Sequence, residues 1–111
     1  MSEYNSESSA ASANQVANFV TRDDLPECEL SICPGVGAAM EENLSDAGIN
    51  KISQLLGHFL TRDNGARSCQ EVCNAFFNYL LEIDIQTRYA HTITFCMANL
   101  AAEKGLFVYE Q

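Results

Sequence analysis

A Pro-Gly-Val-Gly turn that begins at Pro34 constrains the fold of this chain more than any other feature of the sequence. Pro34 ends the helical pattern before it, because the residue that precedes a proline disfavours the helical backbone. Gly35 and Gly37 lack a Cβ atom, so the turn can adopt positive φ angles and admit another group at close range. Apolar residues then recur at helical spacing, at Val36, Met40, Leu44 and Ala47. The sequence therefore predicts a helix-hairpin-helix.

The rest of the chain is also patterned for short helices. Further helix starts are predicted near Asn14, Pro26, Asn50, Ser68 and Thr87. The helix from Pro26 should end at Cys33, and Ser68 with Glu71 forms a capping box that satisfies the unpaired amides of a helix start. We therefore expect an all-α fold, a compact bundle of five or six short helices that contains the helix-hairpin-helix.

Two parts of the chain differ in composition. Residues 1–12 are Ser, Glu, Asn and Ala with one tyrosine, and we expect them to form a flexible tail. Residues 13–111 carry the helical patterns and fit a single domain. The N-terminus lacks the basic and apolar regions of a signal peptide, and no apolar run approaches the ~18 residues of a membrane span. These features predict an intracellular protein, nuclear or cytoplasmic, in a reducing compartment and without membrane insertion.

Acidic residues outnumber basic ones by 15 to 6, which gives a net charge of −9. A protein that binds DNA mainly through its electrostatic field should be basic, and this chain should repel polyanions at long range. A local anion site can still act, because physiological salt screens charges beyond about 8 Å. Composition therefore weighs against a nucleic-acid partner without excluding it.

The turn itself has the features of a phosphate site. Helix N-terminal amides lack partners within their helix, and with the helix dipole they attract anions without any side-chain charge. Such a site would read the DNA backbone and ignore base sequence. The alternative is that Gly35 and Gly37 only make a tight corner between two helices.

The sequence around the turn resembles the barrier-to-autointegration factor (BAF) family, in the stretches "NFVTRDDLPECELSICPGVG" and "EENLSDAGINKISQLLGHFL". The resemblance covers residues 18–60 nearly without gaps. Its most specific parts are Phe19-Val20, Gly35-Val36-Gly37 and "AGINKISQLLGHFL". It weakens beyond Leu60, where this chain has a longer segment, residues 61–74, before an alignable helix.

The resemblance implies a chromatin-associated, nuclear homodimer without enzymatic activity. Each subunit would bind one duplex without sequence preference, so that the dimer bridges two, and LEM-domain proteins would bind in a groove across the dimer interface. In this chain it places the phosphate contacts at Gly35, Val36, Gly37, Ala38 and Arg88. Thr61 and Tyr79 become the candidates for the partner groove, although Tyr79 is equally well explained as a core aromatic.

Gly57 offers an independent argument for a dimer. It lies in the middle of the helical stretch "QLLGHFL", where glycine costs up to about 1 kcal/mol relative to alanine. Close approach of another backbone is the usual reason for that cost. Given the resemblance, Leu56, Gly57 and Leu60 are our candidates for the subunit interface. A contact between helices of the same chain is the alternative.

Several positions depart from the family pattern. A lysine pair usually follows the hairpin, whereas Glu42 and Asn43 stand there in this chain, with Glu41 before them. Neutral residues replace expected cations at Gln15, Tyr89 and Thr92, which leaves Arg88 and Lys51 as the main cations. Glu41 and Glu42 are most simply a solvated helix face. These changes define a second hypothesis, an acidic relative that dimerises, binds partner proteins or a basic BAF relative, and binds DNA weakly or not at all.

Neither a metal site nor an enzyme is indicated. The five cysteines and two histidines show no Cys-x-x-Cys pair and no Cys/His spacing typical of zinc. Buried free thiols are the better interpretation, since free cysteine is among the most buried residue types. We expect no cofactor and no catalytic residue.

Overall fold

The computed structural model describes residues 3–22, 28–63 and 68–107. Within these residues the fold is all-α, which confirms the predicted class, and there is no β-strand. The α-helices are α1 (Ala13–Val20), α2 (Ala38–Asp46), α3 (Ile52–Leu60), α4 (Cys69–Glu82) and α5 (Thr87–Glu103). Two 3-10 turns, η1 (Ser6–Ser8) and η3 (Leu30–Ile32), precede α1 and α2. None of the described helices is long and apolar enough to cross a membrane.

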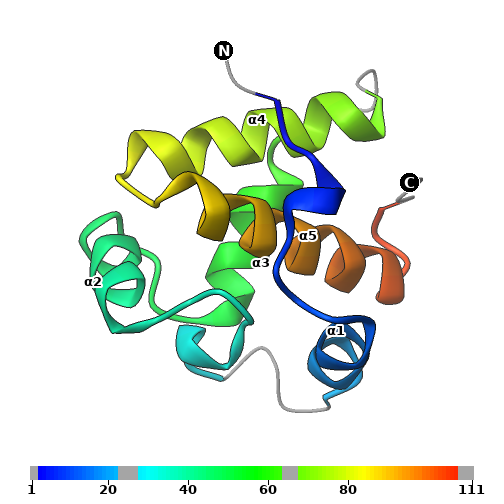
Figure 1. Ribbon diagram of the computed structural model, residues 1–111, viewed down its shortest axis with the longest axis horizontal. Coiled ribbons are helices and arrows are strands. Elements are labelled where there is room, and N and C mark those ends of the chain that lie inside the picture. The colour runs from blue at the N-terminus through cyan, green and yellow to red at the C-terminus, as the bar shows by residue number, and fades with distance from the viewer. Residues whose placement is uncertain (1–2, 23–27, 64–67, 108–111) are drawn as a thin grey trace.

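Helix α5 forms the centre of the molecule. It packs against α1, α3, α4 and η1, and in Figure 1 it runs through the middle of the view with the other helices around it. Ten of its residues are buried, including the polar side chains of His91, Thr92 and Thr94. Buried polar groups usually have hydrogen-bond partners, and His91 and Thr92 each accept a backbone amide, whereas the Thr94 hydroxyl has no partner among the described residues. Helices α1, α3 and α4 each present an apolar face to it, and α2 contacts η3.

The helix predicted from Pro26 to Cys33 is wrong in its extent. Only the three residues of η3 are helical, and residues 26–27 lie outside the described part of the chain. The backbone before η3 is paired elsewhere, because Glu29 forms an isolated bridge with Lys51 and the Ile52 amide donates to the Cys28 carbonyl at 3.2 Å. A backbone committed to the start of α3 cannot also form helical hydrogen bonds. The first arm of the hairpin is therefore a single tight turn.

The N-terminal segment, residues 3–12, corrects the expectation of a flexible tail. It crosses α5 (Figure 1, blue), and the Tyr4 side chain is only 4% exposed. The Tyr4 ring lies 6.5 Å from the Phe77 ring and 6.0 Å from the His91 ring, measured between centroids. The Asn5 amide donates to His91 Nδ1 at 3.1 Å, and the Tyr4 amide donates to Asn74 Oδ1 at 2.8 Å. One buried aromatic and paired amides order a segment that is otherwise polar.

We predict that Tyr4→Ala lowers the free energy of unfolding by about 2–4 kcal/mol, because it removes a buried aromatic ring from the contact with Phe77 and His91. Chemical denaturation of the full chain measures this change. Glu3→Ala, at the exposed neighbouring position, is the matched control and should change the stability little. Equal stability of the two variants would mean that the segment does not hold the fold together.

Candidate nucleic-acid interface

The turn between η3 and α2 is shaped by one glycine in the left-handed region. Gly35 has φ = +91°, whereas Gly37 is extended, with φ = −97° and ψ = −178°, and forms the N-cap of α2. The Val36 amide donates to the Cys33 carbonyl at 3.0 Å, which closes the turn. A residue with a side chain would be strained at the φ of Gly35. Gly35 therefore supplies the conformation of the turn, and its predicted role as a phosphate donor stays a prediction.

The Val36 assignment as a phosphate donor is wrong. Its amide is already paired with Cys33, and its side chain is buried at 7% exposure. The available donors lie immediately downstream, because no described residue accepts from the amides of Gly37, Ala38 and Ala39, and Gly37 has no side chain to cap them. All three residues are exposed. Gly37 and Ala38 therefore remain candidate donors, and Ala39, which follows them in the first turn of the helix, is a further candidate.

Two grooves flank this helix start. The first, which we call the hairpin groove, has a volume of about 410 Å³ and lies between α1, η3 and the turn. Its polar lining consists of Gln15, Asn18, Arg22 and Ser31, and Gly35 and Val36 close it on the turn side. The Arg22 Nη2 atom lies 3.9 Å from Cys28 Sγ. Sequence reasoning missed Arg22, because only the fold brings the end of α1 to the hairpin.

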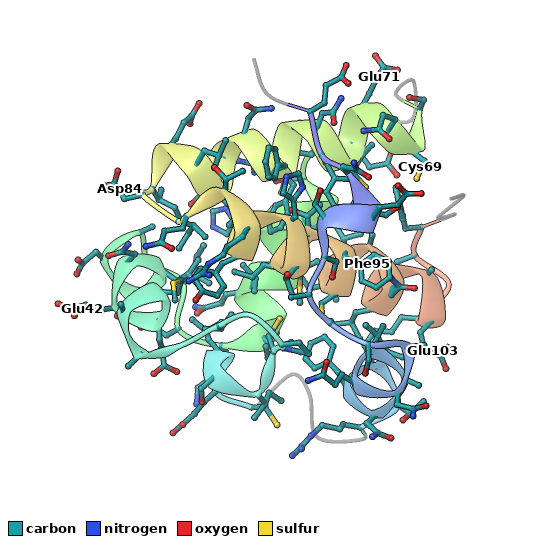
Figure 2. All side chains as sticks on the ribbon, viewed as in Figure 1. Glu42, Cys69, Glu71, Asp84, Phe95 and Glu103 are labelled. Atoms are coloured by element: carbon teal, nitrogen blue, oxygen red, sulfur yellow. The ribbon has the colours of Figure 1, made fainter. Side chains whose placement is uncertain are left out.

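The second groove, here called the acidic groove, has a volume of about 490 Å³ and begins at Ala38. Its charged lining consists of Glu29, Glu41, Glu42, Asp46 and Lys51. In Figure 2, Glu42 points outward from α2, as expected for a solvated helix face. Lys51 was expected among the cations near the DNA surface, and the structure places it between carboxylates instead. The described residues contain no group of three His, Cys, Asp or Glu side chains that could hold a metal ion.

Arg88 lies in the first turn of α5, one helical turn before Thr92, whose side chain contacts Gly35. Its guanidinium group folds over the ring of Tyr89 at 4.5 Å from the centroid, and Nη2 donates to the Tyr89 hydroxyl at 2.7 Å. Arg88 is exposed and can reach an anion only by leaving this ring. Thr92 was expected at a surface position and is instead buried, with 2% exposure.

The candidate dimer residues occupy different environments on α3. Leu56 is buried in the core of its own chain, with 8% exposure, whereas Gly57 and Leu60 are partly exposed. A Cβ atom built on Gly57 would meet no atom within 4 Å. The intrachain contact that could have explained this glycine is therefore not present among the described residues. The space in front of Gly57 is open to another molecule.

The two residues assigned to the partner groove lie close together. Thr61 is exposed, and its hydroxyl accepts from Arg62 Nη1 at 2.7 Å. The Arg62 guanidinium group covers the Tyr79 ring at 4.5 Å, and the His58 ring stacks on the same tyrosine at 5.2 Å. Burial, and then the charge of Arg62, lower the pKa of His58 below its usual value. Tyr79 is half-buried, so it takes part in packing and still borders the surface.

The cysteines are free thiols in mixed environments. Cys33, Cys73 and Cys96 are buried, whereas Cys28 and Cys69 are partly exposed. A hydrogen bond with Cys96, then burial, raise the pKa of the Cys33 thiol, and burial, then the charge of Cys69, raise that of Cys73. A raised pKa suppresses the thiolate, which is the reactive and metal-binding form. Packing is therefore the role that the environment of these buried thiols favours.

Comparison with known proteins identifies the family. The chain matches the family model for barrier to autointegration factor over residues 10–104. No curated protein and no solved structure matches it. The match covers η3, the turn and α1 to α5, and it ends at Lys104, just after α5. On this match, over most of its length, the chain belongs to the barrier-to-autointegration factor family, a family of non-enzymatic DNA-binding proteins.

Proposed function

We propose that this protein binds double-stranded DNA without sequence preference, through the amides at the start of α2. The observation that carries the proposal is the open helix end, where Gly37, Ala38 and Ala39 are exposed and their amides have no acceptor among the described residues. A hydrogen bond from an amide to a charged group contributes about 1.5–3 kcal/mol. Amides of this kind contact the sugar-phosphate backbone, which is the same in every sequence.

Two carboxylates lie at or beside the positions of the family's lysine pair, Glu42 at one of them and Glu41 just before it, and they weaken this site without abolishing it. At a separation of ~8 Å and the dielectric constant of water, each costs about 0.5 kcal/mol against a phosphate. Glu41 and Glu42 together therefore oppose roughly 1 kcal/mol of binding, less than one amide donor supplies. Arg22, in the hairpin groove, and Arg88, on the first turn of α5, add local positive charge.

We further propose that the protein acts as a homodimer in chromatin, in the nucleus, and that the dimer bridges two duplexes. Support for the dimer comes from Gly57, where a Cβ atom would meet none of the described residues within 4 Å, and from Leu60, which is partly exposed beside it on α3. Thr61 and Tyr79 continue the same end of α3 toward α4 and would contact a LEM-domain-like protein. A symmetric pair is the commonest oligomer of a soluble protein.

A specific observation also favours a second function, a protein-interaction module that binds DNA poorly. The acidic groove offers four carboxylates in one depression at the surface of α2 and η3. Complementary charge is the usual basis for selecting a basic partner and for speeding its association. In this second function, the carboxylates of α2 recruit a basic polypeptide, such as a basic BAF relative, and the amides of its first turn remain unused.

Ala38→Pro tests the DNA proposal most directly. Proline is tolerated at the first residue of a helix and removes one donor amide there, and the extended backbone of Gly37 suits a following proline. We expect affinity for a random-sequence duplex to fall about tenfold, measured by fluorescence anisotropy. Ala13→Pro, at the first residue of α1 after an extended Ser12, is the matched control and should leave affinity unchanged.

The salt dependence of the same titration separates amides from cations. Between about 50 mM and 200 mM salt, affinity should fall only slightly, because counterion release scales with the number of phosphates neutralised by Lys and Arg. Unchanged affinity in Ala38→Pro would remove the start of α2 from the interface. Absence of binding by the wild-type chain at low salt would contradict the DNA proposal and favour the protein-interaction function described above.

Charge reversal on α2 tests the second function. The double variant Glu42→Lys, Asp46→Lys should lose about tenfold or more in affinity for an oligolysine peptide, because both side chains line the acidic groove. Glu7→Lys with Glu103→Lys makes the same change in net charge outside the groove, and Figure 2 shows Glu103 at the opposite side of the molecule from Glu42. Equal loss in both variants would mean that only the net charge of the chain matters.

Gly57→Leu tests the dimer. A Cβ atom at this position meets none of the described residues within 4 Å, and leucine should raise the stability of the folded subunit by up to about 1 kcal/mol through helix propensity. In a dimer that brings backbones together at this position it should cause dissociation, measured by sedimentation equilibrium. Ala17→Leu, at an exposed position of α1, is the control. A monomeric wild-type protein would contradict the proposed dimer. A Gly57→Leu variant that remains dimeric would contradict the placement of Gly57 at its interface.

A further inference from the structure

One threonine of α5 joins two segments that are far apart in the sequence. The Thr92 hydroxyl accepts from the Ala10 amide at 2.9 Å and donates to the Arg88 carbonyl at 3.2 Å. The other branch of the same side chain faces the turn, since a Cβ atom at Gly35 would lie 2.9 Å from Thr92 Cγ2 and 3.1 Å from its Cβ. The N-terminal segment and the hairpin are therefore held by different atoms of one residue.

The buried side chains of Cys33 and Val36 anchor the two flanks of the turn in the core, and the Thr92 methyl group lies against the glycine between them. Gly35 contributes no side chain, and its backbone lies directly against Thr92, with Ile93 Cγ1 as the next nearest atom at 3.7 Å from the same Cβ position. The turn is closed internally by the Val36 amide and the Cys33 carbonyl. The direction in which the next amides point depends on how this closed turn is seated on α5.

We propose that Thr92 is the positioning residue of the phosphate site, its methyl group seating the Gly35 turn so that the amides of Gly37, Ala38 and Ala39 face outward. This inference rests on the proposed DNA-binding function. The hydroxyl has a separate role, which is to tie the N-terminal segment to α5 before α1 begins. Thr92 itself, at 2% exposure, touches no ligand.

The two roles can be separated with conservative variants. Thr92→Ser removes the methyl group and keeps the hydroxyl, whereas Thr92→Val keeps the methyl group and removes the hydroxyl. Thr94→Ser is the matched control, because Thr94 is also fully buried on α5 and loses the same methyl group. Its hydroxyl has no hydrogen-bond partner within the described residues.

Amide hydrogen exchange of the free protein tests the positioning role without DNA. The Val36 amide reports the turn and the Ala10 amide reports the N-terminal segment, since each is hydrogen-bonded at the relevant contact. In Thr92→Ser, Val36 should exchange about tenfold faster with Ala10 unchanged, and in Thr92→Val the pattern should be reversed. Similar acceleration at both amides in both variants, as a general loss of stability would cause, would overturn the inference.

Affinity for a random-sequence duplex completes the test. Thr92→Ser should bind about threefold to tenfold more weakly, and Thr92→Val and Thr94→Ser should stay within about twofold of the wild type. Full affinity in Thr92→Ser would overturn the positioning role. If the wild type does not bind the duplex, the proposed function fails, whereas the exchange pattern still decides whether Thr92 seats the turn.

Discussion

Burial of α5 is the constraint on which the rest of this structure depends. The N-terminal segment, α1, α3 and α4 pack on this one helix, and the hairpin touches it through Gly35. A short chain has few ways to bury a core, and a single central helix lets every other element contribute one face. Two buried polar residues of α5, His91 and Thr92, accept hydrogen bonds from backbone amides of the N-terminal segment that crosses the helix.

In the proposed DNA-binding function, the same arrangement explains how a chain with a net charge of −9 can offer an anion site. Side-chain cations are the usual source of affinity for DNA, and they are lost by single substitutions. Helix amides are lost only if the helix start moves, because every residue except proline supplies one. As long as Gly35 can turn and rest on Thr92, substitutions at Glu41 and Glu42 change the strength of the site while its donors remain.

Helical spacing and one capping box were enough to predict most elements, but not how the chain folds back on itself. Ser68 and Glu71 cap α4 as expected, because both partners of that interaction are local in sequence. The helix before Pro34 was predicted too long, because its first part pairs instead with a residue distant in the sequence, through the bridge between Glu29 and Lys51. Composition predicted a flexible N-terminal segment, but the burial of Tyr4 and the hydrogen bonds of the segment's backbone amides to Asn74, His91 and Thr92 are contacts distant in sequence that composition does not reveal.

The candidate site shows the same division. The glycines at residues 35 and 37 indicated a turn and a helix start. They did not indicate that the Val36 amide donates to the Cys33 carbonyl and is therefore already paired within the turn. Thr92 could not be found from sequence, because nothing in its neighbours marks it as the contact of Gly35. Arg22 is followed in the sequence by two aspartates, and only the packing of α1 beside the hairpin places it in the hairpin groove.

The two grooves beside α2 determine how an anion can approach. Carboxylates line the groove that begins at Ala38, whereas the hairpin groove holds Arg22 and neutral amide and hydroxyl side chains. A phosphate backbone laid across the helix start is repelled on one side and tolerated on the other, so the acidic residues restrict the direction of binding more than they reduce its strength. Because screening limits each carboxylate to a range of about 8 Å, this preference is local to the start of α2. The proposed amide site and the acidic groove meet at Ala38, so an anion would approach this helix end from the side of the hairpin groove and a basic polypeptide from the side of the acidic groove.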